Sequence, residues 1–172
     1  MRLFVAIPLS QEMQKSITTA MHELKKTGVK GSYVPGQNLH LTLAFIGEVD
    51  DAKVVRKALE TVSYKPFKLS LDEFGAFQDT LYVGVRGNQG LSNVAKTVRI
   101  VLAARGIHYD EKKFVPHITL VRRASGPWKK VTAPKGEMMV KKISLMKTTF
   151  KDGKPVYSEV CIEKKCNEHS IC

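Results

Sequence analysis

The tetrapeptide His40-Leu41-Thr42-Leu43 recurs 77 residues later in the chain as His117-Ile118-Thr119-Leu120. The 172 residues contain only five histidines, 11 threonines and 14 leucines. Two accidental copies of a His-x-Thr-Leu motif are therefore expected in roughly a few of every ten thousand such sequences. The repeat indicates that the chain is built from two related halves.

The segments in front of the two copies also repeat. An apolar run rich in β-branched residues precedes each motif at almost the same distance, Leu3–Ile7 in the first half and Leu81–Val85 in the second. Apolar residues at helical spacing follow each run, over residues 13–24 and 91–102. The pattern in each half thus predicts a strand, then a helix, then a motif strand.

The motif strands are expected at residues 39–46 and 116–122, and each is followed by a further alternating run, Phe67–Leu71 or Met139–Leu145. These patterns predict an α+β fold of two pseudo-symmetric βα lobes. We expect antiparallel-rich sheets around a central cleft that carries the two His-x-Thr motifs.

The two halves differ in their connections. The first inserts a helical pattern over residues 51–62, whereas the second has a loop rich in Gly, Pro and Lys at Ser125–Lys135. A last strand is predicted at Val156–Ile162. No linker separates the halves, so residues 1–172 are expected to form a single domain, with residues 165–172 as a flexible tail.

Alternation along a strand decides what each motif presents. His40 and Thr42 share one face of their strand, while Leu41 and Leu43 point into the core. The second copy repeats the arrangement, with His117 and Thr119 on one face and Ile118 and Leu120 beneath. Two imidazoles and two hydroxyls would then face each other across the cleft.

This set of groups suits phosphoester chemistry without a metal. Displacement at phosphorus runs in line, with the attacking and leaving oxygens on opposite sides. One neutral imidazole can accept a proton from the attacking water, and a protonated partner can donate one to the leaving oxygen. The hydroxyls of Thr42 and Thr119 are suited to bind the other phosphate oxygens.

Composition and charge limit the function further. The chain is 43% apolar and 26% charged, which is typical of a globular protein. It has no long apolar run, so we do not expect it to span a membrane. Three cysteines do not make a disulfide framework, so we expect reduced thiols and a cytoplasmic location. The net charge is +2 in residues 1–86 and +10 in residues 87–172. Such a field attracts polyanions, although lysines that only confer solubility explain it about equally well.

With these motifs, the sequence resembles the two-histidine (2H) phosphoesterases. It resembles most closely the bacterial RNA 2′,3′-cyclic phosphodiesterases, formerly called 2′-5′ RNA ligases. The resemblance covers residues 1–164 and rests on four segments, which are Arg2–Ile7, Val34–Gly47, Phe114–Arg122 and Leu145–Tyr157.

The resemblance implies hydrolysis of RNA 2′,3′-cyclic phosphate ends to 2′-phosphomonoesters, with no metal and no cofactor. It also implies that His40 is the proton donor and His117 the proton acceptor, roles that the symmetric motifs alone do not assign. It makes Arg122 a phosphate contact. Strict alternation from His117 would put Arg123 on the catalytic face instead, unless a bulge follows Leu120.

Two further functions stay open at this point. The same histidines suit a phosphodiesterase for small cyclic nucleotide phosphates or 2′-5′-linked oligonucleotides. A non-catalytic RNA-binding module would need the basic field but not both histidines. In the preferred interpretation the partner is RNA with a 2′,3′-cyclic phosphate end, and the protein is a monomer without an obligate protein partner or a membrane.

Other candidate residues favour structural roles. His22, His108 and His169 lack a paired context and are expected to be structural. Tyr33 and Phe114 are suited to stack a nucleobase, but packing is preferred. The C-terminal segment also contains four residues of types that bind zinc, but a polar tail is the preferred interpretation of this segment. They are Cys161, Cys166, His169 and Cys172.

Overall fold

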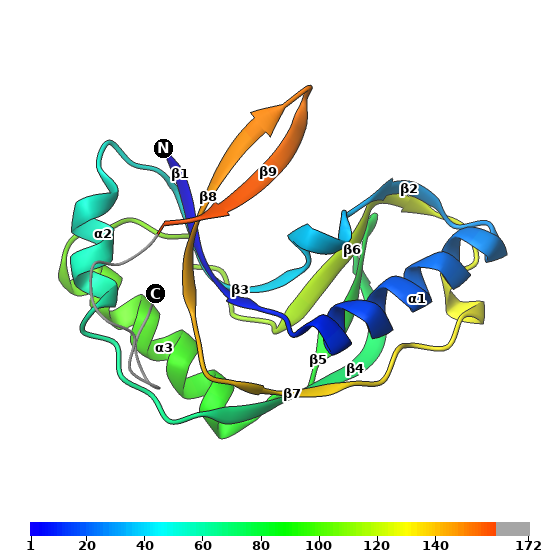
Figure 1. Cartoon of the computed structure of the whole chain (residues 1–172), viewed down its shortest axis with the longest axis horizontal. Coiled ribbons are helices and arrows are strands. Elements are labelled where there is room, and N and C mark those ends of the chain that lie inside the picture. The colour runs from blue at the N-terminus through cyan, green and yellow to red at the C-terminus, as the bar shows by residue number, and fades with distance from the viewer. Residues whose placement is uncertain (161–172) are drawn as a thin grey trace.

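A computed structural model describes residues 1–160 of the chain and shows helices packed on two antiparallel sheets (Figure 1). The elements in chain order are β1 (Arg2–Pro8), α1 (Gln11–Thr27), β2 (Lys30–Tyr33), η1 (Gly36–Asn38), β3 (His40–Glu48), α2 (Ala52–Leu59), β4 (Phe67–Phe77), β5 (Thr80–Val85), α3 (Gln89–Ala104), β6 (His117–Ser125), η2 (Trp128–Lys130), β7 (Glu137–Val140), β8 (Ser144–Lys151) and β9 (Lys154–Glu159). The α+β class predicted from the sequence is confirmed.

The order of the strands shows the pseudo-symmetry. One sheet runs β3-β1-β8-β9 and the other runs β2-β6-β5-β4-β7. The trio β3-β1-β8 in the first sheet matches the trio β6-β5-β4 in the second. Each motif strand, β3 or β6, therefore pairs with the first strand of its own half.

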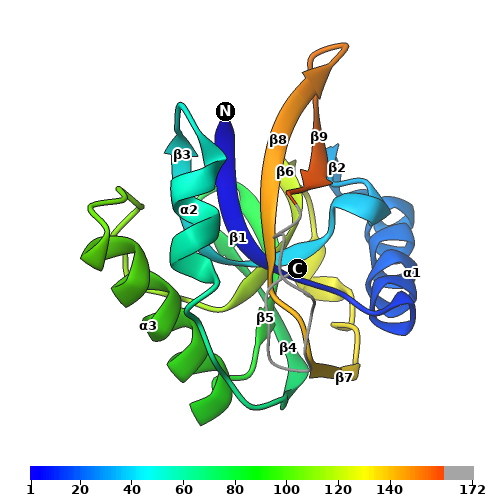
Figure 2. The ribbon, with the colours of Figure 1, turned by 60° about the vertical axis from the view of Figure 1, so that its left-hand side comes forward.

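The two lobes are not the two halves of the chain. Strand β4 follows β3 in sequence, yet it pairs with β5 in the other sheet, and β8 returns to pair with β1. The helices are exchanged between the two lobes in the same way. Helix α3 packs with α2 beside β3, whereas α1 lies along the other sheet (Figures 1 and 2). Each half thus contributes two strands and a helix to the lobe that contains the other half's motif.

The run Met139–Leu145 does not form the single strand that its alternation predicts. It is divided between β7, which pairs with β4, and β8, which pairs with β1. Val140 and Ile143 are both buried although they are three residues apart, because the chain passes from one sheet to the other between them. The expectation of one strand here is wrong.

The last strand also differs in extent from its prediction. Strand β9 covers Lys154–Glu159 and begins before the predicted Val156, because the two-residue turn at Asp152 and Gly153 lets pairing with β8 begin at Lys154. The predicted end at Ile162 lies outside the described residues. The expected flexible tail at 165–172 and the Cys/His segment lie outside the described residues.

Local sequence signals set the ends of the helices. The Ser10 hydroxyl accepts a hydrogen bond from the Met13 N–H at 3.2 Å, and Gly28 ends α1 with a φ of 101°. Asn88 caps α3 through a bond from the Leu91 N–H at 2.8 Å. Across residues 1–160, no helix combines the length and apolarity needed to cross a membrane.

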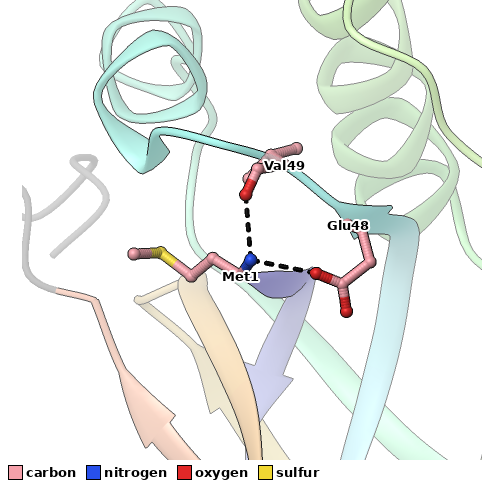
Figure 3. A network of polar contacts seen from close by, with 3 residues as sticks. All are labelled: Met1, Glu48 and Val49. Atoms are coloured by element: carbon pink, nitrogen blue, oxygen red, sulfur yellow. Dashed lines mark hydrogen bonds and ion pairs between the residues drawn. The ribbon is translucent and has the colours of Figure 1, made fainter.

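Residues at both ends of the ladder between β1 and β3 have partners on the other strand or just beyond it. The amino group of Met1 donates to the Glu48 carboxylate and to the Val49 carbonyl, each at 2.9 Å (Figure 3). At the opposite end of the ladder, Pro8 lies across from His40. An exposed ion pair of this kind adds little to the stability of the strand pair. Most of that stability comes from the burial of the apolar face of the two strands.

The apolar residues of both motifs form part of one core. Leu41, Leu43, Ile118 and Leu120 each expose 0% of their surface. A buried side chain of this size stabilises the folded protein through the apolar area that it removes from water.

We expect Ile118→Ala to lower the free energy of unfolding by about 2–5 kcal/mol, because it leaves a cavity in this core. Ile100 on α3 is 55% exposed, so the control Ile100→Val should change the value by less than about 0.5 kcal/mol. Urea denaturation followed by circular dichroism measures both. Equal values for the two variants would contradict the placement of Ile118.

Candidate active site

Each motif histidine is held by the same backbone hydrogen bond. Nδ1 of His40 donates to the Asn38 carbonyl, and Nδ1 of His117 donates to the Val115 carbonyl, both at 2.6 Å. A carbonyl oxygen only accepts, so the Nδ1 proton is fixed in both rings. In the neutral rings the lone pair is therefore on Nε2, the atom turned away from the strand backbone.

The two Nε2 atoms differ in their partners. Nε2 of His40 lies 2.9 Å from the Thr42 hydroxyl, which donates to the neutral ring. In the second motif, Nε2 of His117 makes no hydrogen bond within residues 1–160. Both threonines are half-buried on the same strand face as their histidine.

Aromatic rings surround both histidines in a matching pattern. The His40 ring contacts Phe4 at 4.9 Å and Tyr157 edge-on at 5.3 Å between ring centroids. The His117 ring contacts Tyr82 at 5.2 Å and Phe77 at 5.0 Å. Phe4 on β1 and Tyr82 on β5 occupy equivalent places in the two apolar runs. These rings limit the orientations that each imidazole can adopt.

A β-bulge in each motif strand decides which later side chains join the histidine. In β3, Thr42 pairs with Ala6 and Ala44 with Val5, so Leu43 is the extra residue. In β6, the corresponding pairs leave Leu120 as the extra residue. Such a bulge shifts the alternation by one position.

The bulge in β6 places Arg122 rather than Arg123 on the face of His117. Leu120 and Val121 are both buried, and Arg122 is the next exposed residue. Arg122 is also close enough to His40 for its charge to act on that ring. Arg123 has a φ of 54° and leaves the regular strand.

The same bulge in β3 brings Phe45 to the position that Arg122 holds in β6. Phe45 is 38% exposed, stacks on Phe4 at 5.8 Å and lies under the Arg2 guanidinium. Phe45 was not among the site residues expected from the sequence. Its signal was present, since Phe45 follows His40 by five residues, as Arg122 follows His117.

Electrostatic interactions link the side chains of the two motifs and indicate that they belong to one site. Burial lowers the pKa of His40, the Asn38 hydrogen bond opposes this, and the charges of Arg122 and His117 lower the pKa further. His40 and Arg122 come from different sheets, and β3 contacts β6 directly. The site therefore combines one imidazole that favours its neutral form with a nearby arginine.

The remaining candidates take no part in the hydrogen bonds or ring contacts of the two histidines within residues 1–160. Tyr33 and Phe114 pack against the core, and the Tyr33 hydroxyl donates to the Val29 carbonyl at 2.7 Å. His22 lies on α1 and His108 follows α3. In the described part of the chain, no three His, Cys, Asp or Glu side chains converge as metal ligands.

A family model described as the 2′-5′ RNA ligase superfamily matches residues 12–151. The chain belongs to this superfamily. The resemblance to 2H phosphoesterases noted in the sequence is thereby confirmed.

Two relatives in the superfamily carry the name RNA 2′,3′-cyclic phosphodiesterase. The protein from Thermotoga maritima is 30% identical over 91% of this chain and 91% of its own length. The protein from Escherichia coli is 37% identical over 72% of this chain and 73% of its own. Among solved structures, E. coli LigT in apo form matches with a TM-score of 0.81 and 29% identity, over 93% of this chain and 94% of that one.

We expect His40 to titrate below pH 6.5 in the ligand-free protein, since burial, Arg122 and His117 all disfavour its charged form. Arg122→Gln removes one positive charge, so it should raise the pKa of His40. NMR titration of the imidazole resonances measures the pKa of His40 in the unmodified protein and in the Arg122→Gln variant. The control Arg105→Gln, at the end of α3, should leave the pKa unchanged. A pKa of 6.5 or more, or no response to Arg122→Gln, would contradict this electrostatic account.

Proposed function

We propose that the protein hydrolyses RNA 2′,3′-cyclic phosphate ends to 2′-phosphomonoesters. The observation that carries the proposal is the pair of histidines, each fixed through Nδ1 so that Nε2 is the reactive atom. Membership in a superfamily whose curated members bear the name RNA 2′,3′-cyclic phosphodiesterase supports this activity.

In the proposed reaction His117 is the proton acceptor and His40 the proton donor. Nε2 of neutral His117 takes a proton from water, whose oxygen forms a bond to phosphorus. The bond from phosphorus to the ribose 3′ oxygen breaks, and protonated His40 donates its Nε2 proton to that oxygen. The products are a 2′-phosphate and a free 3′ hydroxyl, so atoms and charges balance.

The lowered pKa of His40 makes its donor role depend on the substrate. In the free protein near neutrality the ring favours the neutral form. A bound phosphodiester carries a negative charge that offsets Arg122 and raises the pKa of His40. The proton donor is thus charged when the phosphate is in place, which couples protonation to binding.

Thr42, Thr119 and Arg122 are the proposed phosphate contacts. All three lie on the site faces of β3 and β6. Their hydroxyl and guanidinium donors suit the oxygens that gain charge during displacement. No step in this scheme requires a metal or a cofactor.

Small nucleotide 2′,3′-cyclic phosphates form a second candidate substrate class. E. coli LigT has been solved in complex with 3′-AMP, and that structure matches this chain with a TM-score of 0.77. The same two histidines would act on a mononucleotide. The proposal further includes a monomer and a cytoplasmic location, and the odd number of cysteines supports the location.

We expect His40→Ala and His117→Ala each to lower kcat by about two to four decades, because each removes a general acid or base. The assay is hydrolysis of a cyclic-phosphate-ended oligonucleotide in the presence of a chelator. His22→Ala, on α1, is the matched control and should stay active. Full activity in a folded His40 or His117 variant would refute the mechanism, and so would a strict need for divalent ions.

The two threonine variants should differ from each other. Thr42→Val removes the hydroxyl that contacts Nε2 of His40, so it should move the pH dependence of kcat/KM as well as weaken phosphate binding. Thr119→Val should reduce kcat/KM about 2- to 10-fold with little change in the pH profile, as expected for one lost hydrogen bond. Steady-state kinetics from pH 5 to 9 would show the difference. Identical pH profiles for the two variants would rule out a special role of Thr42.

A further inference from the structure

Strands β8 and β9 form an arm beside the site. Figure 1 shows the two strands extending past the rest of their sheet. A two-residue turn joins them, and Asp152 and Gly153 in it have φ values of 53° and 75°. Positive φ at both positions is typical of a tight hairpin turn whose twist matches the strands. The arm is therefore a regular hairpin and not an irregular loop.

One face of the arm continues the surface around His40. Residues directly opposite each other in an antiparallel pair share a face. Thr148 lies opposite Tyr157, and Phe150 lies opposite Pro155. Tyr157 and Phe150 are therefore on the same face, and the Tyr157 ring is the one that contacts His40 at 5.3 Å. This face, from Tyr157 to Phe150, runs from the candidate active site to the tip of the arm.

Phe150 is open to solvent at the end of this face. It is 61% exposed, the highest fraction among the large apolar side chains of residues 1–160. A cross-strand diagonal separates it from Tyr157, which corresponds to about 7–8 Å between Cα atoms. A group bound at the histidines would have to extend past Tyr157 to reach Phe150.

The arm also carries unneutralised positive charge. Lys147, Lys151 and Lys154 form no ion pair within residues 1–160, and alternation along the hairpin places them on the face opposite Phe150. Lys151 and Lys154 lie directly opposite each other next to the turn, and like charges in that position repel. This charge attracts polyanions to the arm as a whole rather than to the face of Phe150.

A buried asparagine holds the arm to the catalytic motif. Nδ2 of Asn38 donates to the Pro155 carbonyl at 3.1 Å, and the Asn38 carbonyl accepts the Nδ1 proton of His40. Asn38 is 6% exposed, so neither bond competes freely with water. The position of the arm is thereby set relative to His40.

We propose that the arm binds the RNA strand on the 5′ side of the cyclic phosphate, with a nucleobase stacked on Phe150. This deepens the proposed function and rests on it, since the cyclic phosphate must lie between the two histidines. The RNA chain leaves the site past Tyr157 along the face of Phe150, and the lysines of the opposite face contribute only long-range attraction. Stacking on an aromatic ring accepts any base, so the arm selects polynucleotide over mononucleotide without reading sequence.

Phe150→Ala tests the proposal against a matched control. Val156 is also apolar and 42% exposed, but it pairs with Thr149 on the opposite face of the same hairpin. We expect Phe150→Ala to lower kcat/KM for a cyclic-phosphate-ended oligonucleotide between about 5-fold and about 100-fold. Hydrolysis of 2′,3′-cyclic AMP should stay unchanged. Val156→Ala should match the unmodified protein on both substrates, and Phe150→Trp should retain the oligonucleotide activity.

The outcomes separate this proposal from the proposed function. Equal loss on both substrates, equal loss in the Val156 control, or no loss at all would overturn the role of Phe150. Binding of a fluorescent oligonucleotide, followed by anisotropy, tests the arm without turnover. If the unmodified protein hydrolyses neither substrate while Phe150→Ala still weakens binding, the phosphodiesterase function fails and the arm stands. Binding that does not respond to Phe150→Ala would refute the arm even in an active enzyme.

Discussion

The extra residue in each motif strand determines which side chains the site contains. Leu43 has no partner in β1 and Leu120 has none in β5, and both stay fully buried. Because each adds one position, two successive side chains enter the core and the following one returns to the site face. That is how β3 presents Phe45 and β6 presents Arg122. A regular strand would have presented small apolar side chains at both places.

Much of this arrangement could be predicted from the sequence. Periodicity identified α1 and α3, and the repeated motif identified the two strands that begin at His40 and His117. The class of fold and the superfamily followed from the same residues. Alternation within a motif is a local property, so it needs no knowledge of the partner strand.

The rest depended on pairings between distant segments. The bulges are visible only in register with β1 and β5, so the sequence left Arg122 and Arg123 as alternatives. The alternating run at Met139–Leu145 concealed a crossing between sheets, because both of its parts have strand character. Tyr157 on β9 contacts His40 on β3 although β1 and β8 lie between these strands in the sheet, and the bond from Asn38 to Pro155 spans 117 residues. No local pattern encodes contacts of that kind.

The exchange of strands between the halves has a consequence for how the chain acquires its structure. Leu3 pairs with Lys147, so the first sheet lacks a member until the chain has been made almost to the end of the described region. The second sheet likewise draws β2 and β4 from the first half. Neither half contains a complete sheet, so a folding intermediate with one finished lobe is disfavoured. Both sheets therefore depend on ladders that close long loops, and such ladders form slowly.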